Sequence, residues 1–321
     1  MAAAPLDIAP ADALALRRSI PAEARITEWA AADGWPIRRF DWPAQATARG
    51  AILFQTGRGD VFEKYLETFA HWHARGWSVS AFDWRGQGGS GRLSANPRVG
   101  HASDFAPWIA DLRGFWDAWR AGVSGPAVAI GHSMGGFLVL RALLDGAIAP
   151  DAAVLVAPML GLRSPVGASA GGLLARAMAR LGDPARPAWK DGALPGGDDG
   201  RRRNLTTDMD RYGDEAWWYA RAPELKLGPP SWAWLATAFA ATARLRRDPA
   251  LATMRVPVQM LVADHDWLVE PRDALAVAAR LPEAEVVRFG AESAHEILRE
   301  VDPVRGRALA AIDDFLARHA G

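Results

Sequence analysis

The sequence contains no cysteine among its 321 residues. This absence excludes disulfide bonds, a thiolate nucleophile, and zinc or iron–sulfur sites that are held by cysteine. A nucleophile therefore has to be found among other residue types. We also expect neither a metal ion nor another cofactor.

The sequence also lacks an excess of charge of one sign, and it lacks long apolar runs. The 37 basic residues are matched by 37 acidic residues, so no long-range field attracts nucleic acid. The longest apolar runs, such as residues 152–162, are far shorter than the roughly 18–20 residues of a membrane-spanning helix. We expect no nucleic-acid partner and no integral membrane association, whereas peripheral contact with lipid stays open. The oligomeric state is not predicted.

The first 20 residues show no basic region followed by an apolar block, which a secretory signal would have. We interpret them as a short N-terminal extension of a cytoplasmic protein. What the chain does have is ordinary globular composition, with 50% hydrophobic and 23% charged residues, enough to bury a core.

The order of the apolar runs predicts an α/β fold with a mostly parallel sheet flanked by helices. Two β-prone runs, residues 25–31 and 36–42, flank Asp33-Gly34, a pair typical of a hairpin turn, so the sheet should begin with an antiparallel hairpin. After it, short apolar runs alternate with segments of helical length, as in βαβ units. The buried strands are predicted at residues 50–54, 78–83, 127–131, 152–157, 256–263 and 284–289.

This alternation stops between residues 163 and 247, which we interpret as an inserted helical cap. The core is then formed by residues 1–162 and 248–321. Helices are expected at 168–181, 214–221 and 232–245, with a polar stretch at 192–203. The tryptophans of the insertion either attach the cap to the core or line an apolar substrate tunnel. The candidates for substrate binding are Trp217, Trp218 and Trp232, and the insertion also holds Trp189 and Trp234.

A G-x-S-x-G motif, residues 131–135, follows an apolar strand and precedes a helical pattern. In that context the motif predicts a nucleophile elbow, with Ser133 exposed on a sharp strand-to-helix turn. The two glycines are needed because a Cβ at either position would collide with the neighbouring strand or helix. Ser133 is therefore the predicted nucleophile.

A serine hydroxyl needs a base, and the base in turn needs a carboxylate to orient it. In the nucleophile-elbow fold the order along the chain is serine, acid, histidine, with the histidine after the last strand. His295 fits this position, with His265 as the rival. The acid is expected after the preceding strand, where Asp266 is preferred to Asp264 because it lies further into the loop.

Main-chain N–H groups have to stabilise the oxyanion of the tetrahedral intermediate. We expect one donor from Met134, directly after the nucleophile, and the second from Arg58 in the loop after the first parallel strand. The glycine-rich stretch at residues 83–91 lacks the spacing of a phosphate-binding loop and is interpreted as a structural loop near the site.

Together these residues resemble the monoacylglycerol lipase and lysophospholipase group of α/β-hydrolases, which is related to serine aminopeptidases. The chain differs from the group's pattern at Thr56-Gly57, where the group usually has His-Gly. The matching stretches are residues 56–65 with Lys64-Tyr65, 83–92, 103–105, 131–136, Asp266, 295–298 and Glu300, with weaker matches at Leu205-Thr206, Arg211-Tyr212, Tyr219 and Gly228-Pro229.

We expect a serine hydrolase that cleaves a carboxylic ester with a medium or long acyl chain, such as a monoacylglycerol or a lysophospholipid. The alternatives are a peptidase or amidase, an esterase for small polar esters, or a catalytically silent binding protein. An aminopeptidase should place acids in the cap, where Glu215 and Glu224 are weak candidates. The run Arg201-Arg202-Arg203 is read as a solvated loop, or else as a contact for a phospholipid head group.

Overall fold

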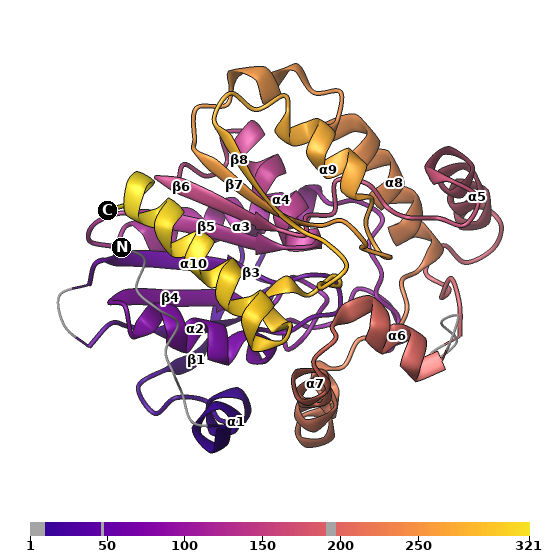
Figure 1. The fold of residues 1–321 in the computed structure, drawn as a ribbon. Helices are drawn as coiled ribbons and strands as arrows, with labels where there is room; N and C mark the ends of the chain where they lie inside the picture. Colours follow the sequence, from indigo (N-terminus) through magenta and orange to yellow (C-terminus); the bar gives the residue numbers. More distant parts are fainter. Residues whose placement is uncertain (1–9, 46–47, 191–196) are drawn as a thin grey trace.

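The computed structural model describes residues 10–45, 48–190 and 197–321, and these form an eight-stranded sheet flanked by helices (Figure 1). The strand order is β1-β2-β4-β3-β5-β6-β7-β8. The strands are β1 (Arg25–Ala30), β2 (Pro36–Trp42), β3 (Gly50–Gln55), β4 (Trp77–Phe82), β5 (Ala127–His132), β6 (Ala152–Val156), β7 (Val258–Ala263) and β8 (Ala284–Phe289).

The predicted hairpin and parallel sheet are both confirmed. Strands β1 and β2 pair antiparallel, with Ala30 opposite Pro36 and Gly34 at a positive φ of 81° in the turn between them. Strand β2 also pairs antiparallel with β4, whereas every pair from β4 to β8 in the sheet order is parallel. Parallel strands end at the same edge of a sheet, so the loops that follow them are brought together there.

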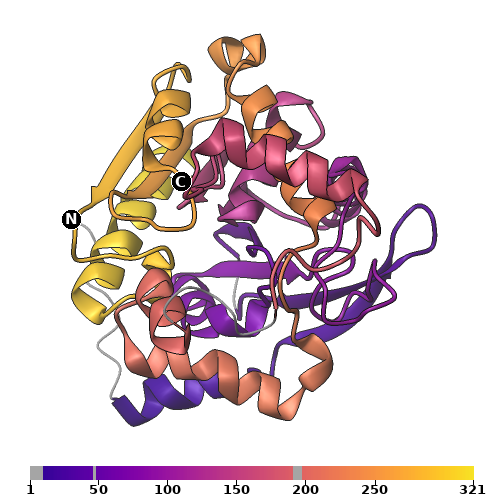
Figure 2. The same ribbon diagram turned by 90° about the vertical axis from the view of Figure 1, so that its right-hand side faces the viewer.

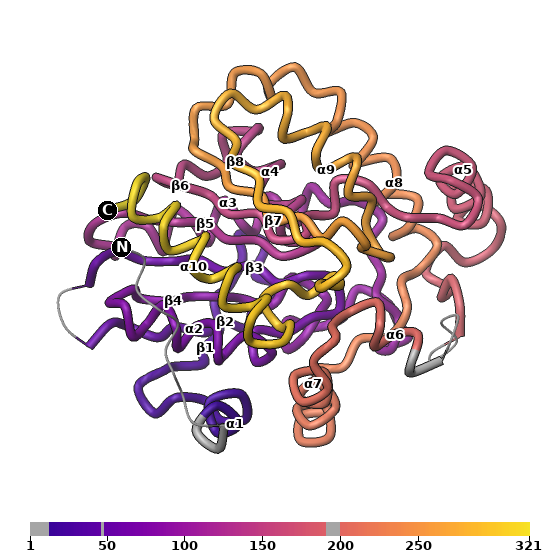
Figure 3. The backbone as a smooth tube through the Cα atoms, viewed as in Figure 1, coloured from indigo at the N-terminus to yellow at the C-terminus, as the bar shows by residue number. Residues whose placement is uncertain are grey.

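Two hydrophobic clusters cover the two faces of the sheet, because neighbouring residues of a strand point to opposite sides. In β3, Leu53 belongs to the cluster under α3 (Ala106–Arg120), α4 (Met134–Leu144) and α9 (Pro271–Ala278). Ile52 and Phe54 belong to the other cluster, under α2 (Leu66–His73) and α10 (Asp302–His319). Figure 3 shows α10 crossing the sheet on the side of α2.

Between β6 and β7 the chain leaves the sheet, and its described residues form four α-helices, which lie on one side of the molecule (Figure 2). Helix α5 packs against α8, whose Trp234, Ala238 and Leu245 join the core. The helices predicted at 168–181 and 232–245 are thereby confirmed. The four helices are α5 (Ala168–Arg180), α6 (Gly197–Leu205), α7 (Met209–Arg221) and α8 (Trp232–Leu245).

Two helices were not predicted. Helix α1 (Pro10–Arg18) replaces part of the expected extension, of which residues 1–9 lie outside the described residues. Helix α6 replaces part of the polar stretch, of which residues 192–196 are likewise outside them. The remaining elements of the described ranges are four short 3₁₀ helices, η1 (Phe62–Tyr65), η2 (Pro223–Leu225), η3 (Pro249–Thr253) and η4 (Ile297–Arg299).

Candidate active site

Ser133 lies in the sharp turn between β5 and α4. Its backbone has φ 53° and ψ −117°, a conformation that costs a non-glycine residue about 1–3 kcal/mol and that persists only where the surroundings enforce it. Three hydrogen bonds hold the turn: Ser133 N–H donates to Val156, and the carbonyl of Ser133 accepts from Phe137 and Met159. The predicted strand–turn–helix context of the motif is confirmed.

The glycines of the motif are required by close packing of main chains. A Cβ atom at Gly131 would lie 2.6 Å from the carbonyl oxygen of Gly135, within α4. A Cβ atom at Gly135 would lie 2.4 Å from the carbonyl oxygen of Gln55, at the end of β3. Any side chain at these positions would push the helix away from the sheet and move Ser133 with it.

His295 and Asp266 form a hydrogen-bonded series with Ser133. His295 Nε2 lies 2.8 Å from Ser133 Oγ, and His295 Nδ1 lies 2.5 Å from Asp266 Oδ2. A carboxylate only accepts hydrogen bonds, so Nδ1 carries the proton and Nε2 is free to accept from the serine hydroxyl. Asp266 and His295 are buried, whereas Ser133 is half-buried and reaches the pocket.

The loop after β7 holds Asp266 beside His295, and it keeps the alternative candidates Asp264 and His265 away from Ser133. Asp266 Oδ1 accepts from the N–H groups of Leu268 and Val269, at 2.8 and 3.0 Å, so the carboxylate is held from both sides. Asp264 instead pairs with Arg288 at 3.0 Å, and His265 is exposed. The structure therefore brings Asp266 and His295, and not Asp264 or His265, to Ser133.

The charges around His295 decide its protonation. Burial lowers the pKa of the imidazole, but the Asp266 carboxylate, together with Glu296 and Asp60, outweighs burial and raises the pKa above its ordinary value. These carboxylates therefore stabilise the imidazolium that forms when His295 takes up a proton.

The loop after β3 runs against Ser133, as expected for an oxyanion loop. A Cβ atom at Gly57 would lie 3.2 Å from Ser133 Cβ, so the main chain just before Arg58 touches the nucleophile. Met134 begins α4, where main-chain N–H groups lack helical partners. Within the described part of the chain, the N–H groups of Arg58 and Met134 donate to no other group.

A buried ionic network that the sequence analysis missed lies behind the histidine. Lys64 Nζ contacts Asp60 and Glu215 at 2.9 Å each and Glu296 at 2.8 Å. Arg201 pairs with Glu215, and Arg299 pairs with Glu296, so three cations balance three carboxylates. These ion pairs lower the pKa of Glu215, and that of Glu296 to about 2, although burial alone would raise both.

The network extends from Asp60 to the residue before the nucleophile. The Tyr65 hydroxyl donates to Asp60 at 2.7 Å and lies 2.9 Å from His132 Nδ1. His132 is buried, and its ring lies 4.9 Å from that of His295. His132 is therefore a packing residue, as expected, and it links the nucleophile turn to the ionic network.

Polar contacts hold α6 to the histidine loop and α7 to α2. The N–H groups of His295 and Glu296 donate to the carbonyls of Asn204 and Leu205, at 3.3 and 2.7 Å. In α7, the Arg211 guanidinium contacts Glu67 of α2 at 2.7 Å. The inserted helices are thus held to the core beside the site itself.

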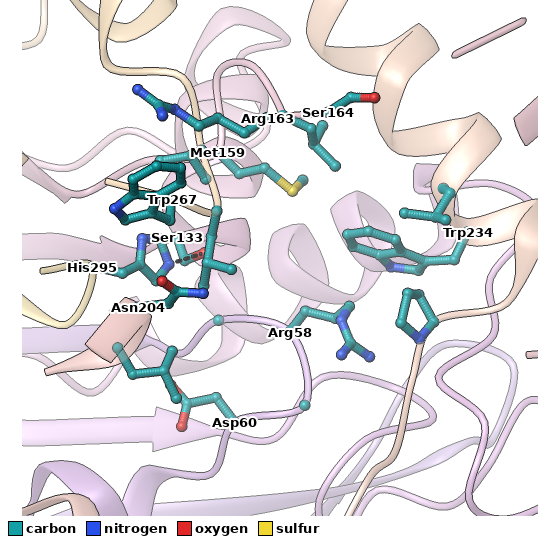
Figure 4. A pocket seen from close by; sticks show the side chains of 18 of the residues that line it. Arg58, Asp60, Ser133, Met159, Arg163, Ser164, Asn204, Trp234, Trp267 and His295 are labelled. Atoms are coloured by element: carbon teal, nitrogen blue, oxygen red, sulfur yellow. Dashed lines mark hydrogen bonds between the residues drawn. The ribbon is translucent and has the colours of Figure 1, made fainter. Parts of the chain in front are cut away.

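A pocket of about 450 Å³ opens above Ser133 (Figure 4). One wall is polar and includes Arg58, Asp60 and Asn204, whose side chain points toward Ser133 and His295. The other wall is mostly apolar, formed by α5, α8 and the loops after β6 and β7. Its apolar lining residues are Met159, Leu162, Pro165, Leu174, Ala175, Trp189, Pro230, Trp232, Trp234, Leu235, Phe239, Trp267, Leu268 and Val269.

Of the three tryptophans predicted to bind substrate, only Trp232 lines the pocket. Trp217 and Trp218 are not among its described lining residues, and their contact with substrate stays a prediction. Both lie on the face of α7 that meets α1: Trp217 stacks under the Arg18 and Arg221 guanidinium groups, and Trp218 Nε1 donates to the carbonyl of Arg17. The pocket face of α7 carries Glu215 instead, because that helix turns its charged side to Lys64.

The structure also shows where the cap residues lie that were candidates for contact with an amine or a phospholipid head group. Glu215 lines the pocket but is paired with Lys64 and Arg201, and Glu224 is exposed outside it. Arg201 lies in the pocket wall on α6, so it does not belong to a solvated loop. Every carboxylate named in the polar wall is therefore already neutralised by a cation.

In residues 10–45, 48–190 and 197–321, no three His, Asp or Glu side chains are grouped so that a metal ion fits between them. The same ranges contain no helix whose length and apolar character would let it cross a bilayer.

Known proteins resemble this chain in sequence and in fold. Residues 46–302 match the family described as serine aminopeptidase, S33. The chain is 31% identical over 314 residues to lysophospholipase L2 of Escherichia coli K12, covering 91% of this chain and 87% of that protein. Among solved structures it resembles a soluble variant of monoglyceride lipase from Saccharomyces cerevisiae, with a TM-score of 0.74 at 19% identity over 95% and 98% of the two chains. The monoacylglycerol lipase of Paleococcus ferrophilus gives a TM-score of 0.68 at 20% identity over 88% and 99%.

Proposed function

Since this chain belongs to the serine aminopeptidase S33 family of α/β-hydrolases, we propose that it is an esterase for monoacyl glycerolipids, that is, for a monoacylglycerol or a lysophospholipid. The observation that carries the proposal is the series Ser133 Oγ, His295 Nε2 and Asp266 Oδ2, with contacts of 2.8 and 2.5 Å, at the floor of a pocket with an apolar wall. The lysophospholipase and monoglyceride lipase named above support the choice of substrate.

In the proposed reaction, Ser133 Oγ attacks the ester carbonyl while His295 Nε2 takes the hydroxyl proton. The negative charge that develops on the carbonyl oxygen is stabilised by the N–H groups of Arg58 and Met134. When the C–O bond breaks, His295 gives its proton to the departing alcohol. Water then repeats the sequence, with His295 as its base, and releases the fatty acid and the free serine.

Asp266 has a supporting part in this mechanism. Its carboxylate keeps the proton on Nδ1 and stabilises the imidazolium formed in each half-reaction, so Asp266 itself stays ionised. The hydrogen bonds from Leu268 and Val269 hold the carboxylate in this position.

The apolar wall suits a long acyl chain, since each buried methylene contributes about 0.8 kcal/mol. We assign the acyl chain to the part of the pocket that is lined by α5 and α8, through Leu174, Ala175, Leu235 and Phe239.

An aminopeptidase function is less well supported. Binding a free N-terminal amine requires an unpaired carboxylate near the nucleophile, and Asp60, Glu215 and Glu296 of the described pocket wall are each held by Lys64. The cytoplasmic location, the division of the chain at residues 162 and 247, and the peripheral contact with lipid stay predictions.

The test is hydrolysis of nitrophenyl esters from acetate to palmitate by the purified protein, beside Ser133→Ala. We expect activity to peak at long chains and to disappear in the variant. Activity that falls steadily from acetate onward would remove the long-chain assignment, and activity retained in the variant would remove the serine mechanism.

A further inference from the structure

The guanidinium of Arg58 lies in the pocket without a carboxylate partner. Its Nη1 donates to the carbonyl of Gly228 at 3.0 Å, and among the described residues no Asp or Glu lies within salt-bridge distance of it. A guanidinium carries five N–H donors, so most of those of Arg58 remain available to a ligand. Figure 4 shows the side chain between Asp60 and Trp234, on the polar side of the pocket.

The carboxylates of the described pocket wall form ion pairs with cations other than Arg58. Asp60, Glu215 and Glu296 balance Lys64, Arg201 and Arg299. The Tyr219 hydroxyl donates to the carbonyl of Gly59 at 3.1 Å, and burial raises its pKa well above the ordinary value, so it adds no negative charge. Burial and the charge of Arg201 lower the pKa of Arg58 to about 10, which still leaves it protonated at neutral pH.

A second donor, the indole N–H of Trp234, lies beside Arg58 and has no hydrogen-bond partner among the described residues. Trp234 is 4% exposed and lines the pocket, and its Nε1–H is buried without an acceptor in the described structure. The Arg58 guanidinium lies 5.5 Å from the centre of the Trp234 ring. A buried N–H without an acceptor costs about 1–3 kcal/mol, so both groups favour a ligand that brings acceptor oxygens.

We propose that Arg58 and Trp234 bind the phosphate of the substrate's head group, and that the site thereby selects lysophospholipids over monoacylglycerols. The inference rests on the proposed function and specifies its substrate. A guanidinium matches phosphate oxygens in a two-pronged arrangement, and an indole N–H supplies a further donor.

The position of Arg58 along the chain suits a substrate that carries an ester and a phosphate close together. Gly57 touches Ser133, and Arg58 is the next residue, so its main-chain N–H serves the ester carbonyl while its side chain extends along the pocket. In a lysophospholipid the scissile ester and the phosphate are separated only by the glycerol carbons. One residue therefore reaches both groups of the same substrate molecule.

The experiment compares two substrates with the same octanoyl chain, a lysophosphatidylcholine and a monoacylglycerol, below their aggregation limits. The readout is the ratio of their kcat/KM values, which cancels any loss that both substrates share through the oxyanion loop. In Arg58→Gln the ratio should fall about 10- to 100-fold in favour of the monoacylglycerol, the size expected for lost charge-assisted hydrogen bonds. Trp234→Phe keeps the ring and removes only the N–H, and should lower the ratio about 3- to 10-fold.

Arg163→Gln is the matched control, because Arg163 is a pocket guanidinium that already has an acidic neighbour, Glu270 at 3.9 Å. Its ratio should stay within about twofold of the parent protein. An unchanged ratio in Arg58→Gln, or an equal fall in Arg163→Gln, would overturn the inference.

A binding measurement separates this inference from the proposed function. In Ser133→Ala, which cannot turn substrate over, the lysophospholipid should bind at least about 10-fold more tightly than the monoacylglycerol, and adding Arg58→Gln should abolish that difference. If the parent protein cleaves neither lipid, the proposed function fails, and the binding contrast still decides whether Arg58 recognises phosphate. Equal binding of the two lipids to Ser133→Ala contradicts the inference by itself.

Discussion

Lys64 Nζ lies 2.9 Å from a carboxylate oxygen of Glu215, so a buried residue of the core, close to the oxyanion loop, is paired with a residue of α7. The same ammonium contacts Glu296, which directly follows the histidine of the site. A single cation therefore joins the core, the inserted helices and the histidine loop.

Replacing Lys64 by methionine should destabilise the protein strongly. Breaking a buried ion pair by removing one partner costs about 3–5 kcal/mol, because it leaves uncompensated charge in the interior, here on Asp60, Glu215 and Glu296. Urea denaturation measures the change in the free energy of unfolding. Lys226→Met is the control, since Lys226 is exposed and should change that free energy by no more than about 0.5 kcal/mol. Equal effects of the two variants would contradict the role of the network.

The pH profile should report the environment of His295. The imidazole acts as a base only when it is neutral, so activity is lost as the pH falls through its pKa. Because Asp266 raises that pKa, kcat/KM should decline at a higher pH than an ordinary histidine would produce.

Asp266→Asn provides the matched comparison for the pH dependence. It removes the charge that raises the pKa of His295 and leaves burial, which lowers it, so the titration of His295 observed by NMR should move to lower pH. The rate should also fall by about 10⁴-fold, since the amide no longer enforces the correct tautomer. A titration that does not move would show that Asp266 is not the dominant influence.

Gly135→Ala should disable the site without removing any functional group. The added methyl would lie 2.4 Å from the carbonyl oxygen of Gln55, so α4 and Ser133 have to shift. A displacement of about 1 Å costs about 100-fold in rate, and we expect at least that loss of ester hydrolysis. Gly122→Ala is the control, because its nearest neighbour would be 3.7 Å away, and it should retain full activity.

Ala175→Trp should shorten the acyl chains that the pocket accepts. Ala175 is a buried residue of α5 that lines the apolar wall, whereas Ala177 on the same helix is exposed. Excluding even two methylenes, at about 0.8 kcal/mol each, lowers the ratio of palmitate to acetate hydrolysis more than tenfold. Ala177→Trp should leave that ratio unchanged, and a fall of similar size in both variants would place the acyl chain elsewhere.

The features predicted well from the sequence are those that depend on short-range pattern. The hairpin followed from Asp33-Gly34, and the elbow from two glycines around Ser133. The position of His295 followed from the order of strands, because the last parallel strand delivers its loop to the edge where the nucleophile lies.

What escaped prediction depends on contacts between distant segments. Helix α6 contains glycines and charged residues, which are typical of a loop. Its last carbonyls nevertheless accept hydrogen bonds from the N–H groups of His295 and Glu296. The sequence predicts a substrate contact for Trp217, because no pattern in it shows which face of α7 meets α1. Lys64 enters the sequence analysis only through the family resemblance. Its ion pairs cannot be predicted from the sequence, because its three partners come from separate parts of the chain.

The order of the segments also has a consequence for the newly made chain. Ser133 precedes the inserted helices, whereas Asp266 and His295 follow them, and the loop that carries His295 comes after β8, the last strand of the described residues. Domains generally fold as units, and β7 and β8 belong to the same sheet as the strand before Ser133. In a nascent chain, Ser133 therefore has no base to activate it until β8 and the loop after it have been synthesised.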